Sequence, residues 1–417
     1  MKKPHVAIVH YSCPPVIGGV EFIVEAHARE FIKAGFDVRM IVGRGDAVLP
    51  EVQTVVIPEM SSSGGPISSV LRSLSKGVFP SAFDAAVQQV EKQLLHALRG
   101  IDVCMMHNVL TMHFNLVLTV ALSRIMKRRG KKIRFIGWTH DLTFSDPLYE
   151  SHQHRRYPWN LLGRSLEGCQ YCVISKERQK QMKRIFRQPL SYFPVIPDGI
   201  DVPRQLHLHP RVKKLFYKEQ LAGVDIVVLT PARILRRKNL GVGMEIIGEL
   251  KKLNKTVRWI ITGAPDAHNS ESVKYFKMLV SLRRRLKLKK EVIFLCERFE
   301  GRVKNNELRS IYRMADMLLF PSESEGFGLP VLEAGLAGLL VVVSDIPALR
   351  ELSGDNAVYI DLNGPFSRVA KNIISAIKKR PQMQDRKRIL FNYSWDVLFE
   401  RKILPAVLKP GTVWRKK

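Results

Sequence analysis

The sequence predicts an α/β protein with two doubly wound, Rossmann-like domains, each a parallel sheet with helices on both faces. Short apolar runs alternate with longer amphipathic segments along most of the chain, which is the pattern of β-α-β units. The alternation pauses once, in a proline-rich segment, and then starts again. The chain has 417 residues, which are too many for one ordinary core and suit two domains of roughly 200 residues.

The first half contains strand-like runs separated by segments of helical spacing. The clearest helix is expected over 19–35, where apolar residues recur at helical intervals and Gly35 supplies a stop signal. The strand-like runs are 5–11, 37–43, 54–58, 101–108, 133–141 and 170–176.

An interdomain connection is expected within 192–210, which holds four prolines and a Pro-Asp-Gly turn signal. The second half then repeats the first pattern. Its strand-like runs are 225–234, 257–265, 291–297, 315–322, 339–345 and 357–361. We therefore expect domains over 1–197 and 198–394, and a final helix over about 395–417 that packs back on the first domain.

The formal net charge of +29 predicts an anionic partner or a generally basic, solvated surface. The candidate partners are a phosphorylated substrate, an anionic membrane surface and nucleic acid. Nucleic acid is disfavoured, because the basic runs lack interleaved aromatic residues and no recognition module is present.

Five scattered cysteines, an odd number, indicate a reducing compartment. The apolar run at the start of the chain is too short for a signal-peptide core, and no run reaches the roughly 18 residues of a membrane-spanning helix. We expect a cytoplasmic protein, with a place at the inner face of the membrane as one option.

Residues 322–335, SESEGFGLPVLEAG, form the strongest ligand-binding pattern. The stretch follows a buried strand and leads into a helix with a proline near its start, so free backbone amides there favour an anion or a hydroxyl oxygen. Gly326 and Gly328 let a ligand approach the backbone. Glu333 can accept two hydrogen bonds from a cis-diol such as ribose, and Glu325 lies where a sugar would be held. The alternative is that Glu333 balances the helix dipole and Glu325 is a surface residue.

Two further loops carry candidate phosphate-binding groups. Arg233 and Lys238 follow the first strand of the second half, in PARILRRKNL, where they could clamp a diphosphate; a basic surface loop is the alternative. Gly18 and Gly19 separate the first strand from its helix, which suits a phosphate-approach turn. Gly-Gly turns are common, however, and the G-x-G-x-x-G fingerprint is absent.

These motifs together resemble the retaining glycosyltransferases of family four, which have the GT-B fold. The resemblance spans nearly the whole chain and is strongest in PARILRRKNL, YRMADMLLFPSESEGFGLPVLEAG and VVVSDIPALRE. It implies an acceptor-binding domain over 1–197 that faces a nucleotide-sugar-binding domain over 198–394 across a cleft. The sequence departs from the family at PDGID, where Asn-Gly is frequent, and at TGAPDAHNSES, where a G-x-G is usual.

The resemblance also implies roles for the matched residues. The donor-binding residues would be Gly18, Gly19, Arg233, Lys238, Glu325, Gly326, Phe327, Gly328, Leu329 and Glu333. Among them, Arg233 and Lys238 would bind the diphosphate, Glu333 the ribose, and Glu325 with the loop after it the transferred sugar. His140, in GWTHD, matches a family histidine near the reacting sugar, while a structural histidine is the alternative.

Breaking a glycosyl–phosphate bond builds negative charge on the leaving diphosphate, which many enzymes neutralise with a divalent metal held by Asp-x-Asp. The sequence contains no Asp-x-Asp, and Arg233 and Lys238 fit as a built-in replacement. We therefore expect no metal and no cofactor. With His140 and Glu325 as further catalytic residues, the expected reaction moves a hexose from a UDP- or GDP-sugar to a hydroxyl, with the retention that the family implies.

The acceptor would be a lipid-linked or cell-envelope glycan, or a small phosphorylated metabolite. Basic clusters at 126–132 and 178–187 could hold the protein on anionic lipid, whereas 281–290 reads as a solvated helix face. Two other functions stay open: a nucleotide-sugar epimerase on the same scaffold, and a non-catalytic anion-binding protein.

Overall fold

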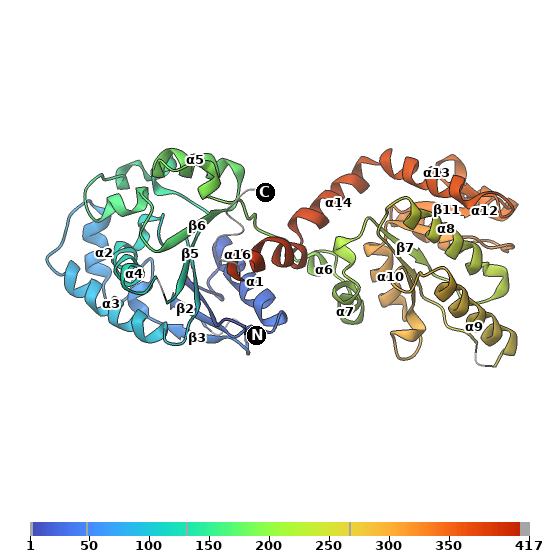
Figure 1. Cartoon of the computed structure of the whole chain (residues 1–417), viewed down its shortest axis with the longest axis horizontal. Helices are drawn as coiled ribbons and strands as arrows, with labels where there is room; N and C mark the ends of the chain where they lie inside the picture. Colours follow the sequence, from blue (N-terminus) through green and yellow to red (C-terminus); the bar gives the residue numbers. More distant parts are fainter. Residues whose placement is uncertain (1–2, 47–48, 131, 267, 409–417) are drawn as a thin grey trace. The chain divides into compact units, whose positions relative to one another are not determined.

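The computed structural model describes residues 3–46, 49–130, 132–266 and 268–408 (Figure 1). The chain divides into two compact units, which we call the first and the second domain. The first consists of Met1–Gly199 and Leu398–Lys417, and the second of Ile200–Val397.

The first domain is built on a six-stranded parallel sheet with the strand order β3-β2-β1-β4-β5-β6. Its strands are β1 (Val6–Ser12), β2 (Val38–Arg44), β3 (Gln53–Val56), β4 (Val103–His107), β5 (Arg134–Thr139) and β6 (Cys169–Val173). Its longer helices are α1 (Gly19–Lys33), α2 (Ser68–Ser75), α3 (Phe83–Ala97), α4 (Leu116–Arg129) and α5 (Lys176–Phe186). Figure 1 shows α2, α3 and α4 on one side of the sheet and α1 on the other.

The second domain repeats this plan with the strand order β12-β11-β10-β7-β8-β9. Its strands are β7 (Ile226–Thr230), β8 (Val257–Ile261), β9 (Val292–Phe294), β10 (Met317–Phe320), β11 (Leu340–Ser344) and β12 (Val358–Ile360). Its helices are α6 (Val202–Gln205), α7 (Pro210–Lys218), α8 (Leu240–Lys252), α9 (Ser270–Arg285), α10 (Asn305–Met314), α11 (Leu329–Leu336), α12 (Pro347–Ser353), α13 (Phe366–Lys378) and α14 (Pro381–Tyr393). The predicted fold class is thus confirmed, and every predicted strand-like run overlaps one of these strands.

The end of the chain is helical but irregular. A single helix was the simplest expectation for 395–417, whereas the described part runs as α15 (Trp395–Leu398), a π-helical turn (Phe399–Ile403) and α16 (Leu404–Leu408). Residues 409–417 lie outside the described residues. The ring of Phe399 packs edge-on against Phe31 of α1 at 4.9 Å, and the guanidinium of Arg134 donates to the carbonyl of Val407 at 2.9 Å.

A glycine on α8 allows a close helix-to-sheet contact in the second domain. A Cβ at Gly243 would overlap Cη2 of Trp259 and lie 2.9 Å from Cζ2. Trp259 is fully buried on β8, and its indole N–H donates to Thr230 at 2.8 Å. Moving the ring would therefore cost free energy, because it would disrupt this hydrogen bond and the close packing around it. Gly248, on the same helix, has open space where its Cβ would be.

This pair gives a matched test of the packing. Gly248→Ala should raise the free energy of unfolding by up to about 1 kcal/mol, because alanine favours the helix. Gly243→Ala makes the same chemical change but should lower it by about 1–3 kcal/mol, because the methyl group overpacks against Trp259. Urea unfolding of both variants measures the difference, and equal stabilisation by both would contradict the contact.

Candidate active site

The second domain holds a buried ion pair where two neighbouring strands end. β7 and β10 are adjacent in the sheet, so the loops that follow them meet at its carboxyl edge. Lys238, in the first loop, donates a hydrogen bond from Nζ to Oε1 of Glu325 in the second. Their side chains are only 11% and 8% exposed. Two predicted catalytic residues are therefore in direct contact.

The charges of this pair are set by burial and by neighbours. Burial lowers the pKa of Lys238, and the interaction with Glu325 opposes that fall. Burial alone would raise the pKa of Glu325, but the hydrogen bond and charge of Lys238 and the charge of Arg237 outweigh it, so the pKa lies below its ordinary value. Glu325 is therefore a stable carboxylate that holds Lys238 in place.

Arg237 ties the two loops together from the outside. Its Nη1 donates to the carbonyl of Ser324 at 3.0 Å and lies 3.3 Å from Oε2 of Glu325. In return, the amide of Glu323 donates to the carbonyl of Arg237 at 2.8 Å. Sequence analysis gave Arg237 no role, because one arginine among several in a loop looks merely solvated; its partner lies 88 positions away.

Arg233 extends from the same loop as an exposed side chain. Its charge reaches Lys238 and helps to lower the pKa of that amine, after burial. Gly263, at the end of β8, makes the position of this loop possible, because a Cβ there would overlap Ala232 and lie 2.6 Å from Cα of Arg233. Gly263 is visible in the sequence as the glycine of TGAP, but no spacing rule would have connected it to the loop of Arg233.

The two glycines of the loop after β10 serve different purposes. Gly328 caps α11 with φ +108°, and a Cβ there would lie 2.8 Å from Leu349. Gly326 has nothing within 4 Å of its Cβ position, so its backbone faces open space. Phe327 and Leu329 are also exposed, by 52% and 62%. The loop therefore presents bare backbone and apolar side chains beside the ion pair.

Glu333, on the next turn of α11, is paired with a tyrosine. The hydroxyl of Tyr312 on α10 donates to Oε2 of Glu333 at 2.6 Å. Burial raises the pKa of Tyr312, and the hydrogen bond and charge of Glu333 raise it further. Both side chains line a cavity of about 520 Å³ that also touches Asn305, Arg309 and Leu336. Sequence analysis missed Tyr312, whose spacing to Glu333 crosses a strand and a loop.

In the first domain, the predicted glycine pair begins α1. Gly18 is the N-cap residue, and a Cβ there would overlap the carboxylate of Glu21 in the first helical turn. That carboxylate accepts a hydrogen bond from Ser12 Oγ at 2.6 Å. The space beside Gly18 is thus occupied by Glu21, whereas Gly19 has nothing within 4 Å of its Cβ position. Gly19 is the open member of the pair.

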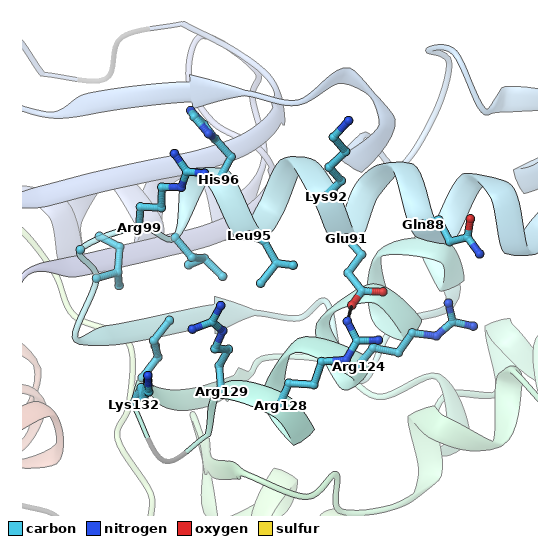
Figure 2. A pocket seen from close by; sticks show the side chains of 14 residues that line it. Gln88, Glu91, Lys92, Leu95, His96, Arg99, Arg124, Arg128, Arg129 and Lys132 are labelled. Atoms are coloured by element: carbon cyan, nitrogen blue, oxygen red, sulfur yellow. Dashed lines mark hydrogen bonds and ion pairs between the residues drawn. The ribbon is translucent and has the colours of Figure 1, made fainter.

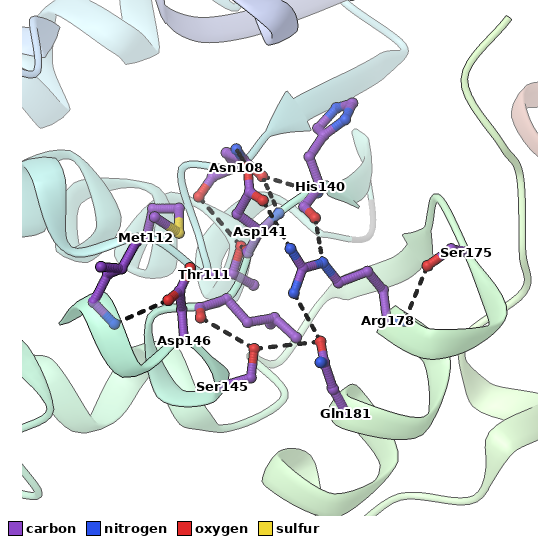
Figure 3. A network of polar contacts seen from close by, with 12 residues as sticks. Asn108, Thr111, Met112, His140, Asp141, Ser145, Asp146, Ser175, Arg178 and Gln181 are labelled. Atoms are coloured by element: carbon purple, nitrogen blue, oxygen red, sulfur yellow. Dashed lines mark hydrogen bonds and ion pairs between the residues drawn. The ribbon is translucent and has the colours of Figure 1, made fainter. Parts of the chain in front are cut away.

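His140 follows β5, and its backbone is fixed from two sides (Figure 3). Its amide donates to Oδ1 of Asn108 at 2.8 Å, and its carbonyl accepts from Nε of Arg178 at 2.7 Å. Asn108 also donates to Asp141 at 3.1 Å, and Arg178 contacts the other carboxylate oxygen of Asp141 at 3.0 Å. Asn108 reaches this position with φ +61°, a left-handed conformation that asparagine tolerates.

Both ring nitrogens of His140 face protein groups. Nδ1 lies 3.4 Å from Oδ2 of Asp198, and Nε2 lies 3.1 Å from Nδ1 of His107. If His107 carries its proton on Nδ1 and donates it to Nε2 of His140, the proton of His140 lies on Nδ1 and faces the carboxylate of Asp198. Asp198 is the residue that departs from the Asn-Gly of the family resemblance. A role for His140 at the reacting sugar stays a prediction.

Residues 212–389, most of the second domain, match the family model for glycosyl transferases group 1. The protein is a glycosyltransferase, and the match to the group 1 family lies in its second domain.

Curated relatives agree with this assignment. An uncharacterised glycosyltransferase of Methanocaldococcus jannaschii is 23% identical over 94% of this chain and 95% of its own. Mannosylglucosylglycerate synthase of Thermotoga maritima is 22% identical over 83% of this chain and 81% of its own. The O-antigen chain mannosyltransferase of Salmonella typhimurium is 38% identical, over 26% of this chain and 28% of its own.

The glycosyltransferase keeps further histidines around His140 in its first domain. His27 on α1 packs against His107 and Trp138 at ring separations of 5.1 and 4.7 Å. His10 on β1 contacts the carbonyl of His107 at 2.9 Å. The sequence signal was available, because the strand-like runs 5–11, 101–108 and 133–141 each end close to a histidine.

Burial keeps these imidazoles neutral. It lowers the pKa of His10 to about 4 and that of His27 to about 3. It holds the pKa of His107 well below the ordinary value, and the neighbouring histidines lower it further. The first domain of the glycosyltransferase therefore carries several bases that are forced to stay unprotonated at the carboxyl edge of its sheet.

The described residues contain neither a membrane-spanning helix nor a cluster of metal ligands. None of their helices combines the length and apolar character that crossing a bilayer needs. Nor do three His, Cys, Asp or Glu side chains gather among them as a metal site would require. All five cysteines are unpaired, and four are buried, with the pKa of each thiol raised by burial.

The histidines make the stability of the glycosyltransferase depend on pH. The unfolded chain protonates them near pH 6.5, whereas His10 and His27 stay neutral in the fold until about pH 4 and 3. Their stabilising contribution is therefore complete above about pH 6.5 and is lost as the pH falls toward those values. We expect a loss of roughly 2 kcal/mol per buried histidine at about pH 5.

Urea unfolding, followed at about pH 7.5 and about pH 5, measures this loss. His27→Phe keeps an aromatic ring and should reduce the pH dependence. Equal stability of the wild type at both pH values would show that the imidazoles are not held neutral.

Proposed function

We propose that this enzyme transfers a hexose from a nucleotide-diphosphate sugar to a hydroxyl group, with retention and without a metal ion. The buried Lys238, held by Glu325 next to Arg233 at the ends of β7 and β10, supports this proposal most strongly. A fixed cation in a mostly desolvated position stabilises developing negative charge better than one in water.

In this proposal the leaving diphosphate binds beside the two loops that follow β7 and β10. Lys238 and Arg233 meet its oxygens, and the free amides that begin α11 add donors. Glu325 positions Lys238 before the donor arrives, and its carboxylate also accepts a hydroxyl of the transferred sugar. The leaving phosphate oxygen then takes the acceptor proton.

The nucleoside would bind through Glu333 and the cavity of about 520 Å³ beside it. A carboxylate can accept both hydroxyls of a ribose, and this cavity is within the range of small-ligand sites. Tyr312 acts as a positioning residue, because its hydrogen bond fixes one oxygen of Glu333 and so orients the other. UDP and GDP both carry the ribose that this contact needs.

Mannose is the hexose that we favour, since two of the relatives are named for mannosyl transfer or mannosylated products. For the acceptor, both a cell-envelope glycan and a small anionic metabolite fit the net charge of +29. The first option includes a peripheral contact with anionic lipid through the basic clusters 126–132 and 178–187. Residue 131 lies outside the described part of the chain. Nucleic acid is not part of the proposal.

The clamp predicts a specific loss of activity. Lys238→Ala and Arg233→Ala should each lower kcat by about 100-fold and weaken the binding of UDP or GDP, because each removes a cation from the leaving group. Arg236→Ala is the matched control, since it removes an exposed arginine of the same loop that stacks near Tyr275 at 5.9 Å. Steady-state kinetics with UDP- and GDP-sugars measure both parameters.

Normal turnover in both clamp variants would remove the basis for the proposal. Activity that is abolished by EDTA and restored by Mg²⁺ would contradict the metal-free mechanism while leaving sugar transfer intact. An epimerised donor that forms in the absence of any acceptor would favour the epimerase alternative.

Tyr312 gives a second, independent prediction. Tyr312→Phe should raise KM for the donor by about five- to tenfold with little change in kcat, because it frees Glu333 without touching the reacting atoms. A 2′-deoxy donor should then lose less affinity relative to the normal donor than it does with the wild type. Tyr359→Phe, which removes a hydroxyl bonded to the Gly354 carbonyl at 2.8 Å, is the control. An unchanged KM in Tyr312→Phe would refute the positioning role.

A further inference from the structure

A cavity of about 820 Å³ lies in the first domain between α3 and α4 (Figure 2). It is lined by the end of α3, the end of α4 and the segments that lead into β4 and β5. The groove therefore opens at the amino ends of these strands, whereas His107 and His140 lie at their carboxyl ends. One strand length of about 16 Å separates the two places, so this groove is not part of the candidate active site.

The groove is strongly basic. Its charged lining residues are Lys92, Arg99, Arg124, Arg128, Arg129, Lys132 and a single carboxylate, Glu91. Figure 2 shows Arg128 and Arg129 reaching from α4 toward α3, from which Glu91 and Leu95 point back, while Lys92 projects from the other side of α3. The two helices thus face each other across a concave, cationic surface.

The single carboxylate of the lining, that of Glu91, already forms an ion pair. Glu91 is only 8% exposed and is bound by Nη1 of Arg128 at 2.6 Å, and Arg124 is bound by Asp84 at 3.0 Å. The other four cations of the lining form no ion pair within the described part of the chain. These are Lys92, Arg99, Arg129 and Lys132. Like charges repel one another, and no carboxylate among the described residues is paired with any of these four cations.

Helix-end electrostatics explain only part of the arrangement. Cations in the last turn of α4 interact favourably with its dipole, which accounts for Arg128 and Arg129. The end of α3 needs no such help from Arg99, because Arg39 already donates to the carbonyls of Ala97 and Arg99 at 2.6 and 3.0 Å. Cations from outside α4 are therefore present without a local structural role.

We propose that this groove binds a soluble ligand with two or more phosphate groups. Four unpaired cations match several negative charges, and the volume suits a discrete small molecule. A bilayer fits the site less well, since the surface is concave and none of the strongly exposed large apolar side chains lines it. The site does not depend on the proposed transfer reaction.

The test is calorimetric titration of the full-length enzyme with inorganic tripolyphosphate at constant ionic strength. The background variant Arg233→Ala/Lys238→Ala removes binding at the clamp of the second domain. We expect one saturable site per chain in that background. Adding Arg129→Ala/Lys132→Ala should weaken it by about tenfold or more.

Lys127→Ala/Lys183→Ala is the matched control, because it removes two exposed lysines outside the groove and should change the affinity less than about twofold. Loss of binding in the clamp background alone would place the anion in the second domain and overturn the proposal. So would the absence of saturation, or equal weakening by both double variants. Co-sedimentation with phosphatidylglycerol vesicles tests whether the groove binds lipid instead. The proposal would also be overturned if the enzyme bound vesicles but not tripolyphosphate, and if vesicle binding depended on Arg129 and Lys132.

Discussion

The contact between Lys238 and Glu325 is the interaction on which the second domain's site depends. It joins the loops after β7 and β10, two neighbouring strands of a parallel sheet, and both side chains are nearly out of water. Breaking such a pair leaves an uncompensated buried charge, which typically costs about 3–5 kcal/mol. The loops therefore keep one geometry, and the amine of Lys238 has a set position. Arg237 and Gly263 reinforce this geometry from either side.

The first domain solves a different problem at the corresponding edge of its own sheet. There burial keeps the imidazoles of His10, His27 and His107 neutral. A hydrogen bond joins His107 to His140, and Asp198 lies 3.4 Å from the other ring nitrogen of His140. Asn108 and Arg178 fix the backbone at His140, so the ring cannot turn without breaking the chain of contacts. One domain thus offers fixed positive charge, and the other offers oriented, uncharged donors and acceptors.

Sequence reasoning reached the fold and half of the site for a clear physical reason. Strands, helices and the loop with Glu325 are local patterns, and each predicted strand-like run overlaps a strand. Residues that act across the sheet were missed. Tyr312 meets Glu333, Gly263 admits the loop of Arg233, and His107 contacts His140, all through contacts between separate elements. Their identity is visible in the sequence, but their partners are fixed only by strand order, which local periodicity does not encode.

The contrast between the two glycines of the loop after β10 has a practical consequence. Gly328 cannot accept a side chain, since its backbone is left-handed and Leu349 fills the space. Gly326 has neither restriction, so the fold would tolerate a methyl or hydroxymethyl group there. Such a group would project into the volume next to Glu325. Position 326 is thus a natural place to engineer selectivity among sugars that differ in the size of one ring substituent, at little expense to folding.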